Sequence, residues 1–155
     1  MTSKANTLHA MVASQHPRLK QNIHDGCLEA KAESFGSRAY SCGHAIHTEV
    51  EVAIGILDAI LDTLLQSMKP FLSSFGTPDP HLSDIAHHVL AQFEQEVLDE
   101  FRKVNQDRLT VSEYARLTES ILDQELGEFR TRAHSAISNM THTVHERCST
   151  HLQDK

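Results

Sequence analysis

The sequence predicts an all-α fold, an elongated antiparallel bundle of three long helices preceded by one or two short N-terminal helices. Apolar residues recur every three or four positions along nearly the whole chain, and no segment shows the alternation typical of a strand. Six Gly and four Pro in 155 residues are too few for a loop-rich protein. Because a chain of this length closes about one core, we expect a single domain over residues 1–155.

The N-terminal segment, residues 1–43, has the weaker helical pattern. A first helix is expected over about residues 4–15 and a second over about 17–34, in which Pro17 suits the first turn. Glycines after position 25 weaken the expectation for the end of this segment. The apolar residues that share one side of these two helices are Leu8, Met11, Val12, Leu19, Ile23 and Cys27.

The strongest helix is predicted over residues 46–68. Its apolar residues follow the a/d rhythm of a heptad, and a second apolar row widens the face to more than a third of the circumference. A helix this apolar lies centrally or is covered by a second subunit, which predicts a homo-oligomer through this helix. Pro70 and the run from Ser73 to Pro78 are expected to mark its end. The two rows are Ile46, Val50, Ala53, Leu57, Ile60 and Leu64, then Ile54, Leu61, Leu65 and Met68.

Two further long helices complete a predicted core bundle over residues 44–152. One is expected to start at Asp79–Pro80, where Asp caps free amides and Pro suits the first turn, and to run to about residue 108. The other is expected to start at Thr110, which has capping-box spacing to Glu113, and to run to about residue 150. Short connections make these neighbours antiparallel.

Charge and hydropathy restrict the class of partner, and the cysteine content indicates a location. Lys and Arg total 14 against 21 Asp and Glu, a formal net charge of -7, and the basic residues do not cluster, so a nucleic-acid partner is not expected. The chain contains no apolar run of membrane-spanning length. Three cysteines without a CxxC pair, and an N-terminus without a secretory signal, predict a reducing, cytoplasmic location.

Histidine is unusually abundant, with 12 residues. Because imidazole titrates near pH 6.5, full protonation would move the formal charge from -7 to +5. This reversal of sign suggests an interaction gated by pH, whereas the plainer interpretation is that histidine fills polar helix positions.

Three groups of residues have spacings that suit metal ligation. The first group falls on one face of its helix, away from the apolar stripe, so we expect it to face water. The second flanks the apolar face of the 46–68 helix, and the third has steps of three that spread it around the last helix. The groups are His81, Asp84 and His88, then His47 and Glu51, then His145, Cys148 and His151.

Enzyme signatures are not found: the sequence has no P-loop, no Gly-x-Ser-x-Gly and no His-Glu-x-x-His. Asp84 and His87 are the nearest analogue of the Glu-x-x-His pairs that line di-metal bundles, and such a pair occurs once. We therefore expect a non-enzymatic bundle without a cofactor that binds protein, including a second copy of itself. The alternative is a bundle that binds zinc, iron or haem for sensing, storage or redox chemistry.

Overall fold

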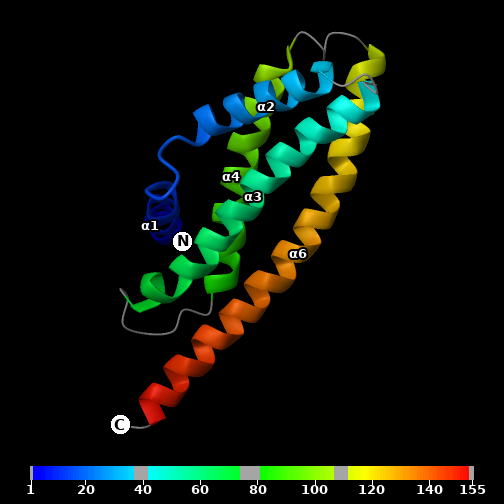
Figure 1. Ribbon diagram of the computed structural model, residues 1–155. Helices are drawn as coiled ribbons and strands as arrows, with labels where there is room; N and C mark the ends of the chain where they lie inside the picture. Colours follow the sequence, from blue (N-terminus) through cyan, green and yellow to red (C-terminus); the bar gives the residue numbers. More distant parts are fainter. Residues whose placement is uncertain (1, 37–41, 74–80, 107–111, 154–155) are drawn as a thin grey trace. The chain divides into compact units, whose positions relative to one another are not determined.

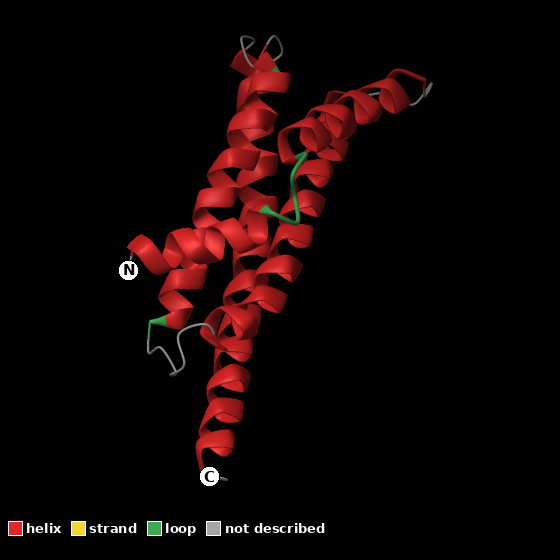
Figure 2. Cartoon of the chain, turned by 90° about the vertical axis from the view of Figure 1, so that its left-hand side faces the viewer, coloured by secondary structure: helices red, strands yellow, loops and turns green. Residues whose placement is uncertain are grey.

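The computed structural model describes residues 2–36, 42–73, 81–106 and 112–153, and describes side chains over 3–30, 46–71, 81–106 and 113–146. All the regular secondary structure in these residues is helical (Figure 2), which confirms the predicted all-α fold. The helices are α1 (Thr2–Ala13), α2 (Leu19–Gly36), α3 (Cys42–Ser73), α4 (Leu82–Val104) and α6 (Ser112–Gln153), as Figure 1 shows.

The chain divides into two compact units. Unit 1 consists of Met1–Pro17, Ala59–Phe93 and Thr131–Lys155, and unit 2 consists of Arg18–Asp58 and Glu94–Arg130. Unit 1 therefore contains α1, unit 2 contains α2, and α3, α4 and α6 each contribute to both. The single-domain organisation stays a prediction, for which we give a test in the Discussion.

Within unit 2, the segments of α4 and α6 run antiparallel. Glu94 pairs with Arg130, and Arg102 pairs with Glu119 at 3.5 Å between Nε and Oε1. Residue numbers therefore rise along α4 while those of the partners on α6 fall, as the short predicted connections require.

The N-terminal helices join the packed cores, although their sequence pattern is weak. In unit 1, α1 lies across the other helical segments (Figures 1 and 2) and buries Leu8 and Val12 completely. In unit 2, α2 buries Ile23 and Cys27 completely. The four-residue spacing of Ile23 and Cys27 places both on the face of α2 that packs inward.

The apolar face of α3 is buried by the chain itself. Of the ten apolar residues predicted on this helix, all except Leu65 are buried in the single chain. The width of the face was the reason for predicting a second subunit over residues 46–68, and its burial removes that reason. The homo-oligomeric contact through these residues stays a prediction without this support, and a contact elsewhere on the surface is considered below.

Helix α3 continues past Pro70 and ends at Ser73, where the run that was expected to mark its end together with Pro70 begins. Proline removes one helical N–H donor, which costs most in the interior of a helix and less in its last turn. Pro70 is exposed, and the next residue, Phe71, is fully buried, so packing of Phe71 holds this last turn in place.

Local hydrogen bonds hold the last turn of α4. Asn105 is buried, and both its backbone N and its Nδ2 donate to the carbonyl oxygen of Phe101, at 3.2 and 2.8 Å. The predicted end of this helix near residue 108 lies outside the described residues. The predicted starting signals at Asp79–Pro80 and Thr110 lie outside the described residues.

Most buried polar side chains are satisfied within their own helices. Ser67 and Thr118 donate to the carbonyl oxygens of Thr63 and Tyr114, both at 2.7 Å. Glu49 differs, because its carboxyl group is fully buried in unit 2. Such burial is costly for a charge without partners, and Glu49 does make interactions.

Substituting Gly26 tests the close packing of α2 against α3. A Cβ atom at position 26 would lie 2.7 Å from Cγ1 of Val52, a side chain that is stiff because it is β-branched. We expect Gly26→Ala to lower the free energy of unfolding by about 1 kcal/mol, since overpacking outweighs the helical preference of alanine. Gly127→Ala is the matched control: no atom lies within 4 Å of its Cβ, so stability should rise by about 0.5–1 kcal/mol.

Urea unfolding of the two variants and of the double variant Gly26→Ala/Val52→Ala measures these effects. The smaller side chain at position 52 should restore part of the loss, because it removes the clashing methyl group. Equal gains for Gly26→Ala and Gly127→Ala would contradict the packing argument.

Candidate functional site

The predicted His81, Asp84 and His88 group lies on the outside of α4. His81 and Asp84 approach to 3.9 Å between Nδ1 and Oδ2, and their side chains are 69% and 72% exposed. His88 is also exposed. The group faces water, as its position away from the apolar stripe predicted.

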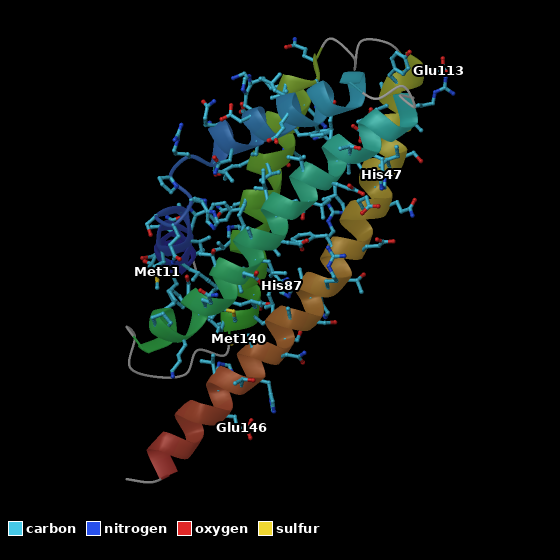
Figure 3. All side chains as sticks on the ribbon, in the orientation of Figure 1. Met11, His47, His87, Glu113, Met140 and Glu146 are labelled. Carbon is cyan, nitrogen blue, oxygen red and sulfur yellow. The ribbon has the colours of Figure 1, made fainter. Side chains whose placement is uncertain are left out.

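Of the two other predicted groups, the second is described completely and the third only at His145. Nε2 of His47 lies 2.9 Å from Oε1 of Glu51, one turn later on α3 (Figure 3 labels His47). His145 is half-buried on α6, whereas the side chains of Cys148 and His151 lie outside the described residues. Within the part of the chain that the structure describes, these residues form no group of three or more metal ligands. Their ligation of a metal stays a prediction.

The structure instead brings together two histidines from different helices of unit 1. The rings of His87 on α4 and His134 on α6 have centroids 5.3 Å apart and planes inclined by 26° (Figure 3 labels His87). Nε2 of His87 is shielded from solvent and has no hydrogen-bond partner among the described residues. The two rings thus bring two titratable side chains of different helices into contact.

Burial keeps His87 neutral. Desolvation lowers the pKa of His87, the nearby His134 lowers this pKa further, and Asp84 one turn earlier opposes both. A proton on Nε2 would place a charged N–H group where no acceptor is recorded, and a second proton on His134 would add like-charge repulsion. The contact is therefore stable with neutral rings and weakened by acid.

Two other histidines of unit 1 make contacts that protonation preserves. Thr63 donates its hydroxyl proton to the Ala59 carbonyl at 3.0 Å, so its Oγ1 accepts a hydrogen bond from Nε2 of His16 at 2.9 Å. Neutral and charged imidazole can both donate this bond. The ring of His9 stacks on Phe93 with centroids 4.3 Å apart, and a charged ring over an aromatic face is attracted to it. Among these contacts, protonation opposes only that of His87 and His134.

Ion pairs join the helices of unit 2. Nε of Arg130 donates to Oε1 of Glu94 at 3.0 Å, and Nη2 donates to the same oxygen. This hydrogen bond raises the pKa of Arg130. The Arg130 guanidinium therefore stays charged when the pH falls through the range in which histidine titrates.

Histidine and net charge segregate between the two units. Unit 1 contains nine of the 12 histidines, and its five Lys and Arg balance its five Asp and Glu. Unit 2 contains three histidines, and nine Lys and Arg against 16 Asp and Glu give it the entire net charge of -7. Full protonation would take unit 1 from 0 to +9 and unit 2 only from -7 to -4.

The sequence indicated His87 only through its spacing to Asp84. It could not indicate His134, because the pairing depends on which turns of α4 and α6 face each other. The segregation of charge was hidden for the same reason, since each unit is assembled from stretches distant in the sequence. Finding the pairing of His87 with His134 and the segregation of charge from the sequence would have required the antiparallel register of α4 and α6.

No helix of the described residues is both long and apolar enough to cross a membrane. A comparison of the chain with models of protein families finds no match, and comparisons with curated proteins and with solved structures likewise find none.

Proposed function

We propose that this chain is a non-enzymatic helical binding protein that associates with itself, and that histidine protonation controls the association. The observation that supports the proposal is the segregation of nine histidines into a unit with zero formal charge. Acidification charges this unit while the other unit stays negative, so the same surface changes from neutral to cationic.

The exposed histidines suit a binding surface. His142 lies on α6 and His81 directly precedes α4, and each has a carboxylate within 4 Å. Their side chains are 83% and 69% exposed. Rigid helices present such groups without an ordering cost, and a proton added to each increases attraction for an acidic partner.

The expected compartment is reducing and cytoplasmic. This proposal is supported by Cys27, whose thiol is buried in unit 2 and is not part of a disulfide. A buried cysteine that stays reduced is typical of proteins from reducing compartments. Acidification of that compartment is then the signal to which association responds.

Binding of zinc, iron or haem is the second candidate function. The pair of His87 and His134 favours it over the predicted groups, because two imidazoles sharing one zinc ion have ring centres about 5 Å apart when Zn–N is about 2.0–2.1 Å. The observed separation is 5.3 Å. Elemental analysis and an absorbance scan of untagged protein test this alternative, and a stoichiometric metal or a haem band would favour it.

Sedimentation velocity on the wild-type protein tests the leading proposal. We expect a monomer at about pH 7.5 and concentration-dependent association at about pH 5.5, because histidine titrates between these values. The samples are dialysed against a chelator, so that bridging by metal does not contribute. One sedimentation coefficient at every concentration and at both pH values would contradict self-association.

A further inference from the structure

We propose that unit 1 of one copy binds unit 2 of a second copy when the histidines of unit 1 are protonated. The inference rests on the proposed function, because it names the partner and the contact for that self-association. Its basis is the complementarity of charge between the two units of the same chain, +9 against -4 at full protonation.

Charge disfavours contacts between like units. Two copies of unit 1 would bring positive surfaces together, and two copies of unit 2 would bring negative surfaces together. Contact between unit 1 and unit 2 joins opposite charges. A pair of copies can make this contact twice and close as a two-fold dimer, or make it once, so that one unit of each kind stays free and the assembly grows.

The charges that drive this contact are exposed on both units. In unit 1, His88 is exposed and the side chain of His142 is 83% exposed. In unit 2, the exposed acidic residues of α6 include Glu113, Asp123 and Glu128. Because solvent-exposed charges are screened by ions, the contact should be strong at about 20 mM salt and weak at about 500 mM.

Matched substitutions separate this contact from a general effect of net charge. The double variant His88→Glu/His142→Glu places acid on unit 1, and we expect its self-association at about pH 5.5 to weaken about tenfold or more. The control His24→Glu/His47→Glu changes the net charge equally but on unit 2, where both side chains are 47% exposed. Self-association of this control should be equal to wild type or stronger.

Mixing two variants tests whether unit 1 of one copy binds unit 2 of another. The triple variant Glu113→Lys/Asp123→Lys/Glu128→Lys alters unit 2 and leaves unit 1 intact, so it should also associate weakly alone. Mixed with His88→Glu/His142→Glu, it supplies the intact unit 1 for the intact unit 2 of the other variant. We expect the mixture at about pH 5.5 to form a 1:1 dimer that does not grow, because the remaining units are both altered. Circular dichroism confirms that each variant keeps its helices.

Two outcomes would overturn the inference. If both double variants weaken association equally, net charge alone governs it. If mixing forms no dimer while the wild-type protein still assembles in acid, the contact joins like units, and the proposed function survives without this geometry. A wild-type protein that stays monomeric in acid would instead overturn the proposed function itself.

Discussion

Replacing Phe93 with alanine should lower the free energy of unfolding by about 3–5 kcal/mol, the usual cost of truncating a buried phenylalanine. Phe93 is 1% exposed and stacks against His9, so the substitution also removes a contact that holds α1 in unit 1. Since single domains have about 5–15 kcal/mol of stability, this loss is a large fraction of the total. Urea unfolding and amide hydrogen exchange measure it, and exchange in α1 should rise most.

Phe129→Ala is the matched substitution in unit 2, where Phe129 is fully buried. We expect a similar loss, but without the local increase of exchange in α1. The pair also tests the single-domain prediction. One domain requires that both substitutions shift one common unfolding transition, whereas two transitions, each sensitive to one substitution, would contradict it.

Lowering the pH from about 7.5 to about 5 should destabilise the protein through His87. The pKa of His87 is lowered by burial and by His134, so the unfolded chain binds a proton more readily than the folded chain. Well above pH 6.5, His87 is neutral in both the folded and the unfolded chain. Stability is lost as the pH falls below the pKa of His87 in the unfolded chain and toward its lower pKa in the folded chain. The groups that act on this pKa are His134 on α6 and Asp84 on α4 itself; no charged group of α1 or α3 is among them.

Substitutions isolate the contribution of His87 to the pH dependence of stability. His87→Leu removes the titrating group and the unpartnered Nε2, so the slope of stability against pH should become shallower between about pH 6.5 and about pH 5. His134→Gln should flatten it less, because burial of His87 remains. His88→Gln is the control, since His88 is the exposed neighbour on the same helix. Urea unfolding at each pH gives the slopes, and identical slopes for His87→Leu and the wild type would contradict the role of His87.

The helices and much of the core were predictable because they depend on local spacing. The rows of α3 and the repeat of Ile23 and Cys27 recur with the helical period, and a periodic apolar face must be buried against something. The sequence could not show whether the chain itself or a second subunit covers the wide apolar face of α3. The chain itself buries this face.

The amino-acid sequence was enough to predict that this protein is helical, that its periodic apolar positions are buried, and that acid reverses its formal charge. These properties follow from composition and from spacing within single helices. Three other properties became apparent in the folded chain: His87 meets His134, Glu49 is buried, and histidine and acidic charge fall into different units. Each of these depends on side chains far apart in the sequence, and packing between helices, not helical periodicity, selects which of them become neighbours.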